Sequence, residues 1–174
     1  MWKIVVVIVV ALIAIILLFL YKRLSKARKN VNNNWDDVEF QIKRRFAIIP
    51  DIVECVNRYT IQEDNILKKL IRLSKQWDEI FDKQEKIETS SSLAKNLNEL
   101  MQETQGYPDI IANATFGELI AELQDTEDKL QYGRKIYNES VEKYNKLINQ
   151  FPTKIVAKIF KMKEEVPYVV RGEK

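Results

Sequence analysis

The acidic and phenolic side chains are the groups in this chain that could do chemistry. Carboxylates in a helical bundle can hold two metal ions or transfer protons, but the usual pattern for such sites includes Glu-x-x-His. The chain contains no histidine. We therefore predict that it is not an enzyme and has no catalytic residue, metal ligand or cofactor. The alternative is a ligand- or metal-binding site between helices, formed by Glu63, Glu127, Asp128, Tyr59 and Tyr137.

Four charged residues interrupt an otherwise apolar pattern. Arg45 and Glu63 lie in the first half of the chain, and Glu127 and Arg134 lie in the second half. Burying a lone charge costs several kcal/mol. Either these side chains pair inside a bundle, with Arg45 and Glu127 as the favoured pair, or their stems lie along the core and their charged heads reach its rim. We interpret the four residues as a structural polar network.

The apolar pattern itself repeats in alternating steps of four and three residues, which is typical of helices packed as in a coiled coil or bundle. It predicts one helix from about Ala27 to Glu88, bent at Pro50, with a break near Thr60 as the alternative. Trp35 and Trp77 occupy core positions of this pattern. Its positions are Val31, Trp35, Val38, Ile42, Arg45, Ile49, Ile52, Val56, Tyr59, Glu63, Ile66, Leu70, Leu73, Trp77, Ile80, Gln84 and Ile87.

Two further helices are predicted downstream. The cap-forming residues 89–92 indicate the start of a short second helix, which Gly106 and Pro108 end. A turn over residues 107–113 precedes a long helix that carries the same spacing from Phe116 to Phe151, with Gly133 allowing a neighbour to approach. A short helical turn follows Pro152. No segment alternates like an exposed strand, so we predict an all-α fold with an antiparallel bundle of long helices.

Residues 4–21 form a separate apolar segment without charge, Gly or Pro. Eighteen helical residues span about 27 Å, close to the roughly 30 Å hydrocarbon core of a bilayer. A cleaved signal peptide is the competing interpretation. However, Phe19, Leu20 and Tyr21 stand where a cleavage site needs small residues. We predict a single transmembrane helix with Trp2 and Tyr21 at its two interfaces.

The basic residues around this segment predict its orientation. Lys3 precedes it, whereas five basic residues follow it directly. Because the more positive flank stays in the cytoplasm, we expect the N-terminus outside and the rest of the chain inside. The same five residues either contact anionic lipid headgroups, at about 1 kcal/mol each, or serve only as the topology signal. They are Lys22, Arg23, Lys26, Arg28 and Lys29.

Charge and cysteine content exclude other classes of protein. Beyond residue 29 the chain has 22 Lys and Arg against 25 Asp and Glu, which argues against nucleic-acid binding. The single Cys55 cannot form an intramolecular disulfide. We expect a short outer N-terminus (1–3), the membrane helix (4–21), a basic segment (22–30), a helical bundle (31–162) and a C-terminal tail (163–174). The tail either docks on the bundle, which is the favoured interpretation, or remains a free peptide for recognition.

Two sequence blocks resemble the LemA family. The first runs from Val31 to Glu63 and includes Trp35, Arg45 and Pro50. The second runs from Tyr107 to Pro152 and includes Glu127 and Arg134. The resemblance implies a bacterial protein with an N-terminal membrane helix, an antiparallel helical bundle and no established enzymatic activity. Two departures from the family pattern are Gln62, where the family often has His, and residues 160–162, where Phe-Gly-Phe is usual.

These features together predict a membrane-anchored, non-enzymatic scaffold or interaction protein in the bacterial cell membrane. Its expected partners are the lipid bilayer, through residues 4–21, anionic lipid, and either another protein or a second copy of this chain.

Overall fold

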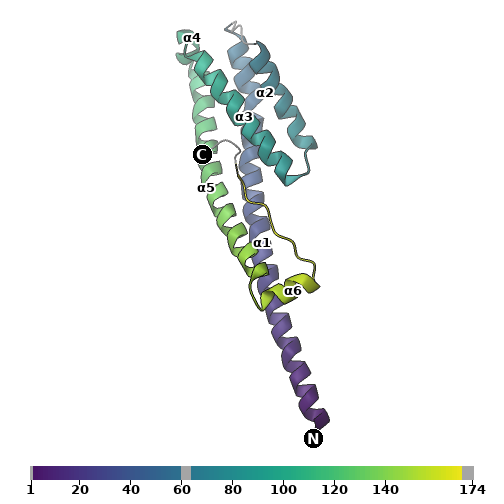
Figure 1. Cartoon of the computed structure of the whole chain (residues 1–174). Helices are drawn as coiled ribbons and strands as arrows, with labels where there is room; N and C mark the ends of the chain where they lie inside the picture. Colours follow the sequence, from purple (N-terminus) through teal and green to yellow (C-terminus); the bar gives the residue numbers. More distant parts are fainter. Residues whose placement is uncertain (1, 60–63, 170–174) are drawn as a thin grey trace. The chain divides into compact units, whose positions relative to one another are not determined.

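The computed structural model describes residues 2–59 and 64–169, and within these ranges the chain is helical with no strand (Figure 1). This confirms the all-α prediction. The elements are α1 (Trp2–Asn57), α2 (Asp64–Gln76), the 3-10 helix η1 (Trp77–Glu79), α3 (Lys83–Thr104), α4 (Pro108–Ile111), α5 (Ala114–Asn149) and α6 (Thr153–Ile159).

The chain divides into two compact units. Unit 1 comprises Met1–Asp36 and Lys135–Pro167, and unit 2 comprises Asp37–Arg134 and Tyr168–Lys174. The long helices α1 and α5 therefore each contribute one part to unit 1 and one part to unit 2. The bundle predicted for residues 31–162 supplies residues to both units.

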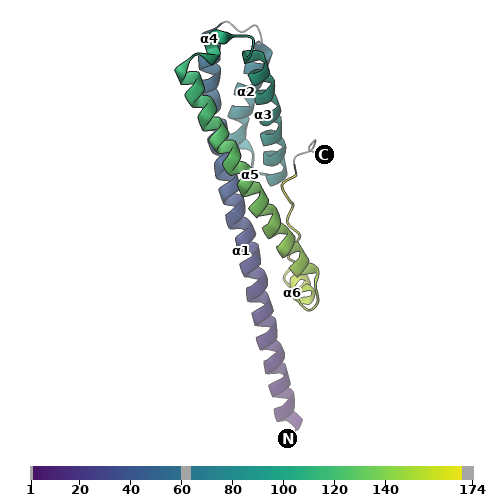
Figure 2. The ribbon, with the colours of Figure 1, turned by 90° about the vertical axis from the view of Figure 1, so that its left-hand side faces the viewer.

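Unit 2 is an antiparallel four-helix bundle. Residues 37–57 of α1, then α2, α3 and residues 114–134 of α5 alternate in direction, and α4 lies at the turn between α3 and α5 (Figures 1 and 2). The core is apolar, and Phe46 stacks on Trp77 with ring centroids 4.7 Å apart. Fully buried core residues include Val38, Ile42, Ile49, Ile52, Val56, Leu70, Leu93, Leu100, Ile110 and Leu130.

Unit 1 packs the end of α5 and the short helix α6 against α1. Its core begins at Leu20 and Leu24, and includes Trp35, whose ring lies 5.4 Å from that of Tyr137. The segment after α6 returns along α5 and is held by its side chains. Tyr137 Oη donates to Val166 O at 2.7 Å, and Asn145 Nδ2 donates to Glu165 O at 2.8 Å. Residues 163–166 of the predicted tail are therefore docked.

The prediction of one helix from Ala27 to Glu88 is wrong. The first helix ends at Asn57 and the next begins at Asp64, which agrees with the alternative break near Thr60. The chain has neither Gly nor Pro at this reversal to mark it. The spacing of apolar residues passes through the break because both antiparallel helices bury one stripe, as Val56 and Ile66 show. A regular stripe cannot distinguish one long helix from two that fold back on each other.

The predicted start of the second helix at residues 89–92 is also wrong. α3 begins at Lys83, and Asp82 caps it by accepting a hydrogen bond from Glu85 N at 3.0 Å. Ser91 lies inside the helix, where its hydroxyl donates to Ile87 O at 2.8 Å. Hydroxyl side chains can satisfy themselves in this way within a helix, so a Ser/Thr cluster is not a reliable start signal.

The predicted end of this helix and the long helix after it are confirmed. The turn expected over residues 107–113 contains the short helix α4, with Pro108 in its first turn, where a missing N–H costs nothing. α5 follows from Ala114. At Gly133 an added Cβ would lie 3.3 Å from Val38 Cγ2, so the glycine permits a close approach of α1. Phe151 was expected in the stripe, but it lies beyond the end of α5 and is exposed.

Candidate functional site

Two arginine side chains of unit 2 form a cluster around Glu127. Arg45 reaches it from α1, with Nη1 2.9 Å from Glu127 Oε2. Arg134, two turns further along α5, places Nη2 3.3 Å from Glu127 Oε1. Arg45 is buried and Arg134 is mostly covered, whereas a third of the Glu127 side chain is exposed. The cluster therefore brings together three of the four charged residues singled out in the sequence; Glu63 lies outside the described residues.

Tyr168, near the C-terminus, completes this cluster. Its ring lies 5.1 Å from the Arg134 guanidinium carbon, and its hydroxyl donates to Ser90 Oγ at 3.2 Å. Burial raises the pKa of the Tyr168 hydroxyl above its ordinary value. The sequence pattern did not indicate Tyr168 or Ser90, because neither is a charged residue that interrupts the apolar stripe.

The electrostatics of the cluster are those of a structural network. Burial lowers the pKa of the Arg45 guanidinium, and the Glu127 carboxylate opposes this shift. Within the described part of the chain, Arg45 Nε and Glu127 Oε2 are both buried without a hydrogen-bond partner. The contact of Arg45 Nη1 with Glu127 Oε2 is therefore an ion pair without hydrogen-bond alignment. The guanidinium groups of Arg45 and Arg134 thus both lie against the Glu127 carboxylate.

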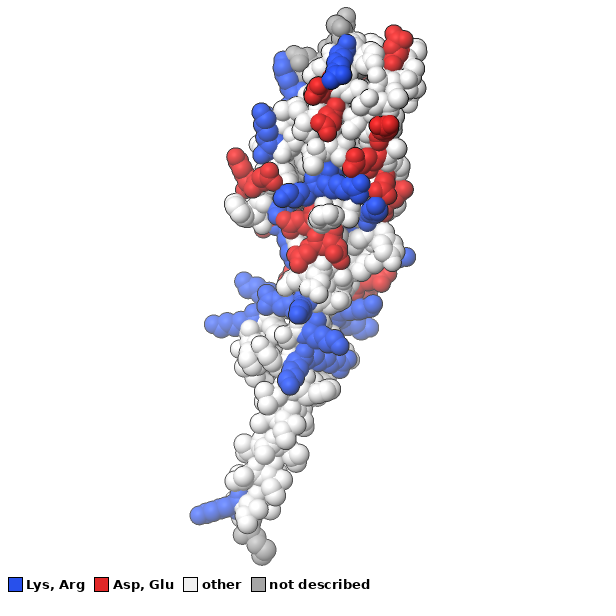
Figure 3. Space-filling model, turned by 180° about the vertical axis from the view of Figure 1, so that it is seen from behind, with Lys and Arg blue, Asp and Glu red and all other residues white. Residues whose placement is uncertain are grey.

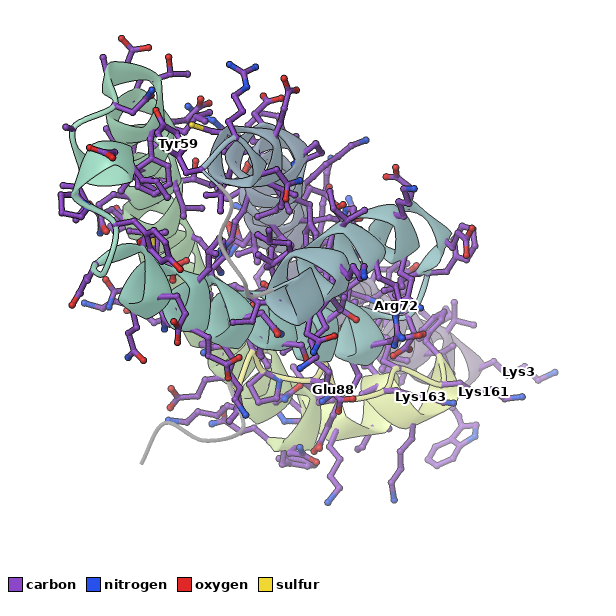
Figure 4. The ribbon with its side chains drawn as sticks, turned by 90° about the horizontal axis from the view of Figure 1, so that it is seen from above. Lys3, Tyr59, Arg72, Glu88, Lys161 and Lys163 are labelled. Atoms are coloured by element: carbon purple, nitrogen blue, oxygen red, sulfur yellow. The ribbon has the colours of Figure 1, made fainter. Side chains whose placement is uncertain are left out.

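The other residues of the alternative binding site have separate partners. Tyr59 Oη accepts a hydrogen bond from Asn113 Nδ2 at 2.7 Å, near the C-terminal end of α1 (Figure 4). Asp128 accepts from Gln124 at 2.9 Å, and Tyr137 donates to a backbone carbonyl. Over residues 2–59 and 64–169, no three Cys, Asp or Glu side chains gather as metal ligands would.

A second candidate site is the basic surface of unit 1. The five residues that follow the apolar segment are all exposed on α1. Three of them line a groove of about 480 Å³ between α1 and α5, together with Lys143 and the polar residues Asn30, Asn33 and Ser140. The three are Arg23, Lys26 and Lys29. Arg28 instead faces Glu165, with Nε 3.8 Å from its carboxylate. Phosphate and carboxylate groups are the ligands that such a groove can bind.

Unit 1 also carries a second group of lysines that was not predicted from the sequence. Residues 143–163 contain six lysines and no acidic residue, and this run without an acid is the signal that could have revealed them. They are Lys143, Lys146, Lys154, Lys158, Lys161 and Lys163. All six are exposed, and Lys161 and Lys163 project from the segment that follows α6 (Figure 4).

The two groups of basic residues give unit 1 a strong positive charge. It holds 13 Lys and Arg against 5 Asp and Glu, a net charge of +8, whereas unit 2 holds 15 against 20, a net charge of −5. Figure 3 shows basic side chains gathered where the apolar end of α1 stops.

The apolar end of α1 has no covering in the structure. Its side chains from Trp2 to Phe19 are almost all exposed, and burial begins at Leu20. By length and composition it is the one helix in the described ranges able to cross a membrane. Tyr21, where the apolar segment ends, packs on Phe160 with ring centroids 4.4 Å apart.

These features define an all-α bundle protein whose first helix is compatible with a single membrane span. The sequence model of the LemA family matches residues 34–174. The chain belongs to the LemA family. No curated protein matched the chain.

Proposed function

We propose that this protein is a single-pass membrane protein whose helical bundle lies in the cytoplasm and acts as a non-enzymatic scaffold or interaction module. The observation that carries the proposal is the course of α1. One helix begins with exposed apolar residues, passes the basic surface of unit 1 and then supplies core residues such as Val31 and Ile42.

The energetics of the apolar segment support the membrane anchor. Insertion of its Val, Ile, Leu and Phe residues contributes on the order of −5 to −9 kcal/mol in total. Left in water, the same side chains would form an apolar surface far larger than a soluble monomer usually exposes. The adjacent positive charge of unit 1 favours the cytoplasmic side and anionic lipid there.

The surface of unit 2 supports an interaction role. Three aromatic side chains point away from its core: Phe40 is 63% exposed, Tyr132 69% and Phe81 91%. Exposed aromatic residues are the type that anchors protein interfaces. Phe81 lies in the loop between η1 and α3, directly before the α3 cap residue Asp82.

Membrane-impermeant thiol labelling tests the orientation. We would introduce a cysteine at the exposed Lys95 of unit 2 and, as a matched control, at Trp2; the native Cys55 is buried. We expect Trp2→Cys to react in intact cells and Lys95→Cys only after the membrane is opened. Labelling of Lys95→Cys in intact cells would reverse the orientation.

Site-specific photo-crosslinking in native membranes tests the interaction role. A photoreactive residue at Phe81 is compared with one at Asn98, an exposed polar position on α3. We expect a product of defined mass at position 81, either a dimer or a complex with another protein. A chain that stays monomeric and uncrosslinked at both positions contradicts the scaffold role. Repeating the test without residues 164–174 shows whether the tail takes part.

A further inference from the structure

The short helix α6 exposes an apolar stripe next to lysines. Ile155 and Ile159 are four residues apart, so they lie within about 40° of each other around the helix, and they are 48% and 62% exposed. Lys154 and Lys158 border this stripe and are also exposed. The opposite face, which carries Val156 and Ala157, is buried in unit 1. An exposed face that is half apolar and half basic is typical of helices that lie in a membrane interface.

The contact with Tyr21 places the end of α6 beside the end of the apolar segment, where a helix in a membrane interface would lie. Tyr21 ends the apolar segment, and its ring packs on that of Phe160, the residue that follows α6. Figures 1 and 2 show α6 beside α1 at the point where the long helix leaves the rest of unit 1. If α1 crosses a bilayer, its end at Tyr21 lies in the headgroup layer, and Phe160 lies there with it.

Charge identifies the occupant of this face. Lys154, Lys158 and Lys161 lie within or next to the exposed stripe, and no acidic residue occurs from residue 143 to residue 163. A second copy of the chain docked face to face would bring these lysines against one another. An anionic lipid surface would neutralise them and would also accept the isoleucine side chains.

We propose that α6 is an interfacial helix, whose Ile155, Ile159 and Phe160 insert into the headgroup layer of an anionic bilayer while its lysines bind lipid phosphates. This inference rests on the proposed membrane anchor. It adds a second contact with the bilayer, separated in sequence from the span by more than 130 residues.

Collision-based spin-label spectroscopy on the full chain in anionic lipid nanodiscs tests the proposal. The background variant is Cys55→Ala, and its helix content must equal that of the parent. Single spin labels are placed on it at Ile159, at Leu12 in the apolar segment and at Glu139, an exposed residue of α5. Oxygen partitions into lipid, and a nickel chelate stays in water. We expect the ratio of oxygen to nickel collisions to be several-fold higher at positions 159 and 12 than at 139.

The outcomes separate the two proposals. The interfacial helix is overturned if the label at position 159 is as accessible to nickel as the label at position 139 while the label at position 12 stays in lipid. That result leaves the membrane anchor intact. A water-accessible label at 12 overturns the anchor itself. Dipolar coupling between labels at 159 on two chains would assign the face to a second copy and overturn the lipid assignment.

A charge variant tests the lysines separately. In the triple variant Lys154→Gln, Lys158→Gln and Lys161→Gln, we expect the collision ratio at 159 to fall at least twofold in anionic nanodiscs and to be unchanged in zwitterionic ones. An unchanged ratio in both lipids overturns the role of the lysines.

Discussion

Units 1 and 2 stabilise their polar interiors in different ways. In unit 1, the side chains of Tyr137, Tyr144 and Asn145 bind backbone groups of the returning tail, and the charged side chains other than Glu165 are exposed. In unit 2, Arg45 and Arg134 hold the carboxylate of Glu127. The net charges are opposite, +8 and −5. A net charge of +3 for the whole chain conceals this contrast, so charge is informative here only when it is counted unit by unit.

The largest expected effect concerns the basic surface of unit 1. Replacing the basic groove residues Arg23, Lys26, Lys29 and Lys143 by Gln removes four cationic contacts worth up to about 1 kcal/mol each, or up to about 4 kcal/mol in attraction to anionic lipid. Enrichment of a fluorescent anionic lipid around the reconstituted protein measures the loss.

The matched control makes the same change of charge in unit 2, with Gln at Lys43, Lys69, Lys75 and Lys95, which are all exposed. We expect no loss of lipid enrichment, because unit 2 is net negative and does not attract anions. Equal losses in the two variants would show that the contrast between the units has no bearing on lipid binding.

The next effect concerns the ion-pair cluster of unit 2. Glu127→Gln leaves the buried Arg45 charge without its partner and should lower the free energy of unfolding by about 3 kcal/mol. Arg45→Met should cost less, because Arg134 still compensates Glu127. Urea unfolding in detergent, followed by circular dichroism, measures both variants. An unchanged midpoint for Glu127→Gln would mean that solvent already screens the pair.

Alkaline pH should destabilise unit 1. Burial raises the pKa of Tyr137 to about 12, with the charge of Glu165 adding to the shift. At pH values between the ordinary tyrosine pKa of about 10 and this raised value, Tyr137 loses its proton in the unfolded state but keeps it in the folded state. The free energy of unfolding is therefore highest below pH 10 and declines by up to about 2.7 kcal/mol as the pH approaches 12.

The variant Tyr137→Phe isolates this effect. It should lose about 1 kcal/mol at neutral pH, because the hydrogen bond to Val166 O is gone, and its alkaline decline should be shallower than that of the parent. Burial also raises the pKa of Tyr144, and of Tyr168 in unit 2, so some decline should remain. The same alkaline slope in variant and parent would exclude Tyr137 as its source.

The smallest predicted effect lies at the start of α5. Asn113 Oδ1 accepts from Phe116 N at 3.0 Å, and Asn113 Nδ2 donates to Tyr59. Asn113→Ala should cost about 1 kcal/mol in thermal or urea unfolding, as expected for a lost helix cap. Asn98→Ala on the exposed face of α3 is the control and should change stability by less than about 0.5 kcal/mol. Equal effects of the two would remove the special role of Asn113.

The sequence predicted the buried stripes better than the turns between them. Buried positions recur at regular intervals along a helix, so spacing alone could assign four residues to the core. They are Ile49, Ile52, Leu97 and Tyr144. The reversal of the chain after Asn57 could not be predicted from spacing, because two antiparallel helices can continue the same stripe. The cap at Asp82 was overlooked because the Ser/Thr cluster at 89–92 gave a stronger local signal.

The candidate sites show the same limit. The spacing suggested Arg45 and Glu127 as partners, and the structure places them 2.9 Å apart. Tyr168 and Ser90 join that cluster only through tertiary packing. Likewise, Lys143 lies more than 110 residues from Lys29 in the sequence, yet both line one groove. Local patterns identify which residues are unusual, but not which distant residues join them.

The way α5 holds the returning segment has a consequence for sequence variation. Tyr137, Tyr144 and Asn145 bind the main chain of residues 163–166, and Asn145 also accepts from the amide of Glu165. Main-chain groups are common to every amino acid except for the missing proline N–H. Substitutions at Lys163 or Val166 should thus leave the attachment in place, and proteases that need an extended free backbone should find this stretch protected.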